Sequence, residues 1–304
     1  MSPFSIVVCL IGAIVLFVSP APLRAQELEP GAYWPIPKGL NIVTAIGIVN
    51  WGDVAFEPSL PVEDAAATIA TSAFAYTRAF GLGGRSANAL AMLPIAGGHL
   101  TGRYLGEDTE VDRFGLADPK LKFAVNLFGA PAMTPGEFAK YRQRLIVGVS
   151  LTVMPPLGQY DPTKLVNLGT NRWSFKPEIG LSRSYGKWVI EGMAGVWLFT
   201  DNTNFAGGRT REQDAIVSIQ GHFTRRFTGG MWLAADANYY RGGRTTINGR
   251  LNIDFQNNSR IGATFSKSLS RGHAIRASLS RGAYTTIGAR FTSLAVGYNY
   301  AWRR

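Results

Sequence analysis

The sequence predicts an all-β protein, a transmembrane antiparallel β-barrel of about 12 strands, with 14 as the alternative count. Apolar and polar residues alternate along most of the chain, which places each set on one face of a strand. In 213–226, for example, Val217, Ile219 and Phe223 oppose Gln220 and His222. The polar faces are rich in Gly, Ser, Thr and Asn, whereas a soluble sandwich or lipocalin-like barrel exposes more Lys and Glu. Aromatic residues mark strand ends, as they do at a lipid–water boundary.

The composition excludes several other classes of protein. Of the 304 residues, 46% are hydrophobic and only 17% are charged, although the net charge is +11. Disorder and strong phosphate binding both need denser charge, so we expect no nucleic-acid partner. The single cysteine, Cys9, excludes a disulfide framework and a cysteine-based zinc site. We expect no metal and no cofactor.

The first 25 residues have the features of a secretory signal peptide. The apolar run 6–18 is too short for a transmembrane helix and precedes a cleavage site after Ala25; an uncleaved anchor is the alternative. Residues 26–39 then form a short N-terminal extension, long enough to enter a barrel mouth but too short for a plug domain. The barrel itself is expected to span 40–304.

The strand count depends on the segment 242–268. A first count of thirteen cannot close with both chain ends on one side, because single-chain bacterial barrels have an even number of strands. If 242–249 is a loop, then 250–268 is one strand, since Leu251, Ile253 and Phe255 share the parity of Ile261 and Phe265. The expected strands are 40–51, 66–80, 86–97, 118–128, 142–154, 171–183, 187–199, 213–226, 230–241, 250–268, 273–282 and 288–302.

The connections between these strands alternate in length, as they do in outer-membrane barrels with long outer loops and short periplasmic turns. The expected outer loops are 52–65, 98–117, 155–170, 200–212, 242–249 and 283–287. The expected turns are 81–85, 184–186, 227–229 and 269–272. The connection 129–141 is long for the periplasmic side. The best helical candidate begins within it, at Pro135–Gln143.

Charged and polar residues on the inward faces are the candidates for a solute path. They are Lys176, Glu178, Glu191, His222, Asp236, Arg250, Asp254, Arg276 and Arg290. Charges of both signs can pair and partly fill a barrel interior, so a structural lumen and a selectivity role both stay open. His222 has either a lumenal role or a plain hydrogen-bonded one, because the three histidines are too scattered to predict a metal site.

Two further groups of residues are assigned by position. Loop 155–170 and the start of the following strand contribute Tyr160, Asn167, Asn171 and Arg172, which either meet a solute at the mouth or pack the loop against itself. The expected aromatic girdle consists of Trp173, Trp188, Tyr298, Tyr300 and Trp302.

Several stretches resemble one known family across about 31–302. They are GAYWPIPKGLN (31–41), GDVAFEPSLP (52–61), GRSANALAMLPIAGG (84–98), GLADPKLKFAVNLFGAP (115–131), PPLGQYDPTKLVNLGTNRWSFKPEIGLS (155–182) and YYRGGRTTINGR (239–250). In order and spacing the chain resembles the outer-membrane transporters named after the MetA pathway of phenol degradation. The resemblance implies a β-barrel and a hydrophobic or aromatic solute. Many such barrels end on an aromatic residue that the barrel-assembly machinery recognises, whereas here Arg303 and Arg304 follow Trp302.

Together these observations predict a passive outer-membrane channel for small molecules, driven by the solute gradient, because no energy-coupling or nucleotide motif is visible. Its expected partners are outer-membrane lipid and lipopolysaccharide, the solute, and the barrel-assembly machinery. Loops 98–117 and 155–170 are expected to cover the mouth. The alternative is a closed structural or surface-binding barrel. A third hypothesis, an outer-membrane lipid hydrolase, needs a Ser–His couple facing lipid, and no motif marks such a serine. We therefore expect no enzymatic activity.

Overall fold

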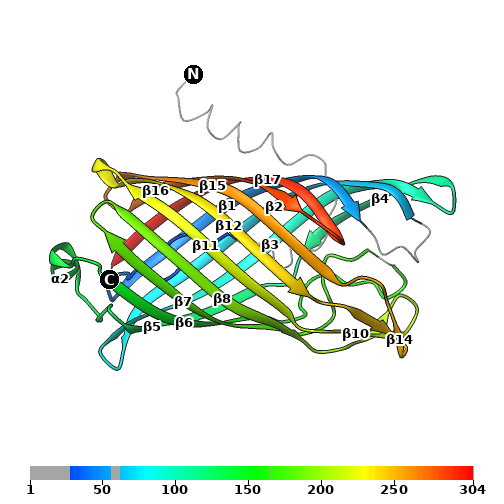
Figure 1. The fold of residues 1–304 in the computed structure, drawn as a ribbon, viewed down its shortest axis with the longest axis horizontal. Helices are drawn as coiled ribbons and strands as arrows, with labels where there is room; N and C mark the ends of the chain where they lie inside the picture. Colours follow the sequence, from blue (N-terminus) through cyan, green and yellow to red (C-terminus); the bar gives the residue numbers. More distant parts are fainter. Residues whose placement is uncertain (1–27, 56–61, 165, 304) are drawn as a thin grey trace, which may run out of the picture.

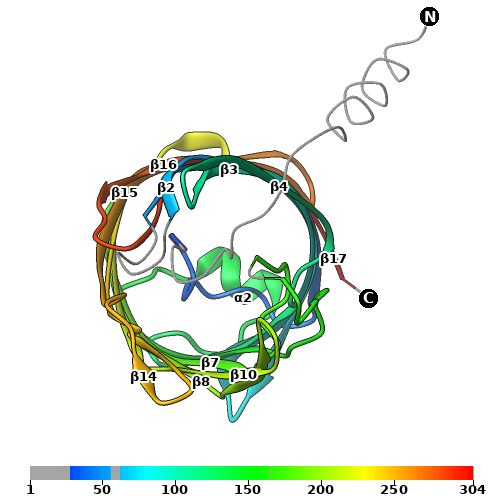
Figure 2. The same cartoon turned by 90° about the vertical axis from the view of Figure 1, so that its right-hand side faces the viewer.

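The computed structural model describes residues 28–55, 62–164 and 166–303 as a closed antiparallel barrel (Figures 1 and 2). The expected signal peptide and its cleavage site lie outside these residues. Thirteen described strands form the closed sheet: β1 Leu40–Ala55, β2 Val62–Leu82, β3 Arg85–Tyr104, β4 Glu107–Leu116, β5 Lys120–Phe128, β6 Leu145–Met154, β7 Ser174–Tyr185, β8 Trp188–Phe199, β11 Ile216–Arg226, β12 Met231–Gly242, β15 Gln256–Ser270, β16 His273–Tyr284 and β17 Gly288–Arg303.

The barrel has twelve strands because β4 and β5 lie end to end along β3. Residues 95–104 of β3 pair with β4, and residues 87–92 of β3 pair with β5. Pairing of β1 with both β2 and β17 completes the ring. The predicted all-β antiparallel barrel of twelve strands is therefore confirmed.

The two faces of the wall differ as a membrane-spanning barrel requires. Large apolar side chains are exposed on the outer face, among them Phe74, Ile179, Leu181, Ile219 and Val296. Their neighbours in sequence point into the lumen, where many polar side chains are buried. This is the inverse of a soluble barrel and matches a lipid-facing exterior. No helix among the described residues is long and apolar enough to cross a membrane.

The two ends of the barrel are unlike. Tight turns join β2 to β3, β7 to β8, β11 to β12 and β15 to β16 at one end, the short-turn end, where β1 begins and β17 finishes. The opposite end, the long-loop end, carries the longer connections (Figure 1). The connection from β5 to β6 lies at the short-turn end and contains the helix α2, Pro135–Lys140, capped by Thr134. The helix ends three residues before the predicted Gln143.

The prediction of a loop at 98–117 is wrong. Strands β3 and β4 continue as a hairpin that projects beyond the rim at the long-loop end (Figure 1). Leu105 and Gly106 turn the hairpin with positive φ angles of 55° and 84°. His99 pairs with Asp112, and Arg103 pairs with Glu63 and Asp108. These polar side chains suit strands that have water on both faces, and such strands lack the alternation that marks a membrane wall.

The prediction of one strand over 250–268 is also wrong. A separate four-stranded sheet at the long-loop end joins β9 Asn202–Phe205, β10 Arg209–Gln213, β13 Thr245–Ile247 and β14 Arg250–Leu251. The barrel strand β15 begins only at Gln256. Leu251 and Ile253 are 57% and 71% exposed, and they precede the first residue of β15. Their alternation in sequence therefore does not reflect the inward and outward faces of the barrel wall.

Candidate functional site in the barrel lumen

A stretch of chain before the first strand lies inside the barrel. Residues 28–39, here called the inner segment, cross the lumen towards the short-turn end, seen in dark blue in Figure 2. The backbone N–H of Glu29 donates to Oε1 of Gln220 at 3.2 Å. That of Gly31 donates to Oε2 of Glu191 at 3.0 Å. Residues 28–39 therefore lie inside the barrel, held by side chains of the wall.

Tyr33 anchors the middle of the inner segment. Its ring occupies a slot left by Gly148 and Gly180, two paired glycines of β6 and β7. A Cβ atom on either glycine would overlap carbon atoms of the ring. The hydroxyl donates to Oε1 of Glu178 at 3.2 Å and lies 3.1 Å from Oγ of Ser150. With only 2% of its surface exposed, Tyr33 is buried in the wall of the lumen.

The lumen wall beside this segment carries a chain of ion pairs. Glu29 pairs with Nζ of Lys120 at 3.0 Å and also with Lys122. Lys122 lies 3.8 Å from Glu178, which binds Nζ of Lys176 at 2.6 Å. Because four of these five side chains come from β5 and β7, the inner segment closes the network by adding the fifth.

A second polar cluster continues this wall across β8, β11, β12 and β15. Nδ1 of His222 lies 2.7 Å from Oδ1 of Asp236, and Thr264 donates to Oδ2 of Asp236 at 2.6 Å. Glu191 stands opposite His222 in the register of β8 and β11. We call the inward face of β5 to β15, with these two clusters, the charged wall.

The inward faces of β1, β2 and β3 have a different chemistry. They present mostly half-buried or buried apolar side chains, which we call the apolar wall, with the polar Thr44, Asn50, Thr71, Thr77 and Asn88 between them. Its members are Ile46, Ile48, Ile69, Ala73, Ala75, Leu90, Met92, Pro94 and Ala96. In the strand order of the ring, β1 to β3 lie opposite β8 to β12. The lumen is therefore two-faced, mostly apolar on one side and charged on the other.

Aromatic rings and cations gather where the inner segment approaches the short-turn end. Trp34 meets Trp232 edge to face at 5.5 Å between ring centroids. The guanidinium of Arg226 lies 4.4 Å from the Trp34 ring centroid, and that of Arg276 lies 5.1 Å from Trp232. Cations at these distances are attracted by the ring faces. The cluster places aromatic rings and cations together inside the short-turn end of the lumen.

The structure brings six of the nine predicted path residues to the lumen and places three elsewhere. Lys176, Glu178, Glu191, His222, Asp236 and Arg276 belong to the clusters above. The lumenal position predicted for the other three is wrong. Arg250 is exposed in β14 of the loop sheet. Asp254 accepts hydrogen bonds from the backbone and hydroxyl of Thr245 in that loop region.

Arg290 is the third displaced residue. It pairs in register with Asp53 at the long-loop end of β17 and is exposed. Its neighbour Phe291 is 4% exposed and packs with the inward-facing Ala67 and Ile69. Since adjacent residues of a strand point to opposite faces, Arg290 faces outward. The sequence prediction counted it with the polar face, although its parity is that of Leu294 and Val296.

The predicted mouth residues hold the loop together. Tyr160 donates to the carbonyl of Asn204, and Asn171 donates to Asn202. Asn167 donates to the carbonyls of Asp161 and Lys164. Arg172 is 2% exposed and lies 4.3 Å from the Phe199 ring centroid. These contacts support the self-packed alternative, while contact with a solute stays a prediction.

Asp161 illustrates how tightly this loop is held. Its Oδ1 accepts from the backbone and hydroxyl of Thr163 at 2.9 and 2.6 Å, and Oδ2 pairs with Lys164 at 3.0 Å. The hydrogen bonds from Thr163, with the nearby ammonium, lower the pKa of the Asp161 carboxyl from 3.8 to about 2.

The predicted girdle residues lie on the outer face near the barrel ends. Trp173 stacks on Phe175 near the long-loop end, and Trp188 stacks on Phe223 near the short-turn end. Tyr298, Tyr300 and Trp302 follow one another on the outer face of β17, with Tyr300 stacked on Trp302. Trp173 therefore marks the rim at the long-loop end, whereas Trp188, Tyr298, Tyr300 and Trp302 mark the rim at the short-turn end.

Sequence reasoning missed part of the site. Lys120 and Lys122 alternate with Leu121 and Phe123, so parity could have found them. Glu29, Tyr33 and Trp34 carry no periodic signal. Arg260 of β15 is 3% exposed, and its Nη1 donates to Ser280 and Ser293, both at 2.7 Å. Nowhere in the described residues do three or more His, Cys, Asp or Glu side chains gather as a metal site requires.

Comparisons with known proteins agree with this architecture. The model of the family described as "Putative MetA-pathway of phenol degradation" matches residues 52–300. A search of curated proteins gave no match. Among solved structures, an outer membrane channel from Pseudomonas putida F1 is similar with a TM-score of 0.75 and 20% identity, covering 91% of this chain and all of that one.

Two autotransporter domains are less similar. The beta domain of a Bordetella autotransporter has a TM-score of 0.49 and 14% identity, covering 86% of this chain and 99% of that one. The translocator domain of NalP from Neisseria meningitidis has a TM-score of 0.45 and 11% identity, covering 88% and 90%. The channel from Pseudomonas putida F1 shares the fold of this chain.

Proposed function

The chain belongs to the family named for the MetA pathway of phenol degradation, and from this premise we propose that it is a passive outer-membrane channel for small amphipathic molecules, with aromatic compounds as the favoured class. In this orientation the short-turn end faces the periplasm and the long-loop end faces outward. Flux follows the solute gradient.

The two-faced lumen is the observation that carries this proposal. A phenol-like molecule has an apolar ring and one polar group. Ile48 and Met92 of the apolar wall offer surface to the ring, while the charged wall across the lumen offers hydrogen-bond partners to the polar group. In a general porin filled with water, Ile, Met, Leu and Ala side chains along one side would be unfavourable, because they form no hydrogen bond with a hydrated solute.

The inner segment makes the path one-sided. The contacts given above for Glu29, Gly31 and Tyr33 go to β5, β6, β7, β8 and β11. The segment therefore covers part of the charged wall, and a solute that passes it moves beside β1 to β3. A closed barrel without transport is the second candidate, because the same ion pairs and the same segment fill part of the interior.

Flux measurements on purified protein separate the two candidates. In liposomes, we expect entry of phenol-sized aromatic solutes to exceed entry of sugars of similar mass, and planar bilayers should show steady conductance. Ile48→Ser with Met92→Gln should lower aromatic entry about tenfold or more, because burying one apolar side chain contributes about 1.5–3 kcal/mol. The matched control is Ile48→Val with Met92→Leu, which keeps the wall apolar. No conductance and no solute entry by the folded protein would sink the channel proposal.

A further inference from the structure

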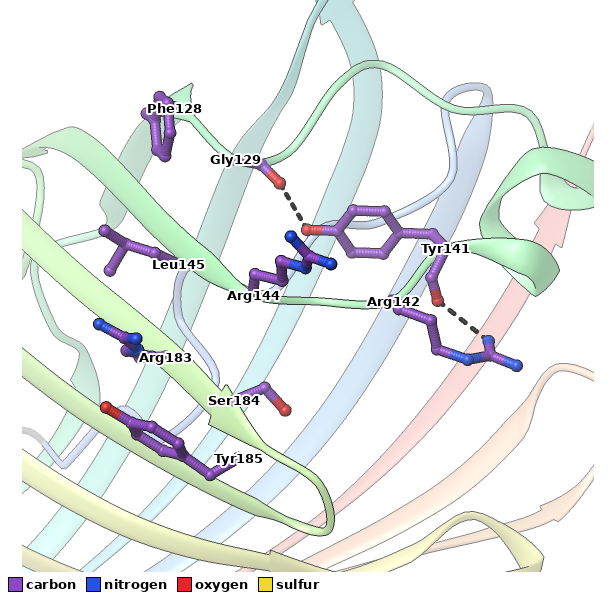
Figure 3. A pocket seen from close by; sticks show the side chains of 9 residues that line it. All are labelled: Phe128, Gly129, Tyr141, Arg142, Arg144, Leu145, Arg183, Ser184 and Tyr185. Carbon is purple, nitrogen blue, oxygen red and sulfur yellow. Dashed lines mark hydrogen bonds between the residues drawn. The ribbon is translucent and has the colours of Figure 1, made fainter.

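A cavity of about 700 Å³ lies on the outside of the barrel at the short-turn end, away from the lumen (Figure 3). Its lining combines aromatic residues with cations, and no acidic residue is among them. The lining residues are Phe128, Gly129, Tyr141, Arg142, Arg144, Leu145, Arg183, Ser184 and Tyr185. We call this cavity the rim pocket. It plays no part in the solute path described above.

Register shows that the rim pocket opens on the membrane-facing surface. Arg183 pairs with Leu145 and belongs to the same face of β7 as Ile179 and Leu181, which are 50% and 51% exposed. Tyr185 continues this row at 53% exposed. A row of two apolar side chains, then an arginine, then a tyrosine is the order in which a lipid presents its acyl chain, phosphate and headgroup. Arg183 therefore lies between the exposed apolar row and the last residue of β7.

Three arginine side chains line the rim pocket, and none of them forms an ion pair with a described carboxylate. In the described part of the chain, no ion pair to Asp or Glu is found for Arg142, Arg144 or Arg183, and all three are exposed. Arg183 lies 5.0 Å from the Tyr185 ring centroid, which holds its planar group at the pocket edge. Arg142 is turned to the carbonyls of Ala139 and Tyr141. Arg144 and Arg183 remain to bind an anion.

Hydrogen bonds join the chain segments that line the rim pocket. The hydroxyl of Tyr141 donates to the carbonyl of Gly129 at 2.5 Å, which ties the chain after α2 to the end of β5 (Figure 3). The backbone N–H of Ser184 donates to the carbonyl of Arg144 at 3.0 Å, and so places Arg144 beside the end of β7. The two arginines are thereby fixed on neighbouring segments.

We infer that the rim pocket binds the headgroup of a phospholipid with net negative charge in the periplasmic leaflet. Arginine forks match phosphate oxygens, and basic pockets at a membrane boundary recognise anionic lipids. The acyl chains lie along the exposed apolar row of Leu181 and Ile179. Charge complementarity and the continuity of the pocket with the lipid-facing band select this occupant over a soluble anion.

Native mass spectrometry of the purified full-length protein tests this inference. The protein is mixed with equal amounts of phosphatidylglycerol and phosphatidylcholine of identical acyl chains, and the retained lipids are counted. We expect preferential retention of phosphatidylglycerol. The preference should fall about fivefold for Arg144→Gln or Arg183→Gln alone and about 25-fold for both together.

The control pair is Lys267→Gln with Arg271→Gln, which removes the same charge at the same end of the barrel but outside the rim pocket. It should retain the preference. Equal retention of the two lipids by the wild-type protein would overturn the inference, and so would an equal loss in the control pair. Displacement of the lipid by millimolar inorganic phosphate would overturn it too, by showing an adventitious anion site only. Folding is checked by the heat-dependent gel mobility of barrels, and the single variants carry the test if the double variant fails to fold.

Discussion

A substitution in the slot that holds Tyr33 should release the inner segment from the wall, without any change in the segment itself. In Gly180→Ala, the new Cβ occupies the position of Tyr33 ring carbons, so the ring must leave. The segment itself is unchanged, and Gly180 pairs with Gly148 in a regular stretch of β6 and β7. The substitution therefore tests docking without altering any residue of the inner segment.

The expected magnitude follows from what Tyr33 loses. Its hydroxyl gives up the bond to the Glu178 carboxylate, worth about 1.5–3 kcal/mol for a charged partner, and its ring returns to water, which costs roughly 1.5–3 kcal/mol. A total loss of about 3 kcal/mol or more shifts the ratio of docked to undocked segment by at least roughly 100-fold.

Single-channel recording measures the consequence. We expect Gly180→Ala to show higher conductance than the wild type, with transitions between the two levels if the segment returns. Gly192→Ala is the control, because Gly192 lies on the outer face of β8 and a methyl group there would meet open space. A folded Gly180→Ala channel with the conductance of wild type and control would refute the reasoning that Tyr33 holds a path-narrowing segment.

Two further predictions concern charge. Lys176→Met removes one partner of a buried pair whose side chains are each 2% exposed, and should destabilise the barrel by about 3–5 kcal/mol. Adding Glu178→Gln should recover part of this loss, as urea unfolding in lipid vesicles would show; fully additive losses would contradict the pairing. For Asp161, the depressed pKa means that its contacts are complete above 3.8 and are lost as pH falls through about 2. The amide resonance of Thr163 should titrate with that midpoint, and a midpoint near 3.8 would contradict the loop geometry.

Strand parity predicted the barrel well where the wall is regular and lipid-facing. Alternation along their strands predicts a lumenal position for Lys176, Glu178, Glu191, His222 and Asp236, and the structure places them there. Period-two alternation is a direct consequence of strand geometry. It therefore fixes facing wherever one face meets lipid.

Strand parity gave wrong predictions where neither face of a segment meets lipid. The hairpin of β3 and β4 projects into water, so its outer half has no apolar face to mark it as strand. Leu251, Ile253 and Phe255 show the reverse failure, an alternation with no wall behind it. The inner segment could not be foreseen, because the hydrogen bonds that hold Glu29, Gly31 and Tyr33 to the wall reach partners 91 to 191 positions away along the chain. Such contacts depend on the closed ring.

The same long separations set an order of events during assembly. Residues 28–39 precede all the strands of the ring, yet Tyr33 and Glu29 can dock only after β5, β6 and β7 have formed their side of the slot. Contacts this distant along a chain are slow to form. The first part of the chain is therefore among the last to reach its final place. A barrel that has closed but not yet received this segment is a wider pore than the finished protein.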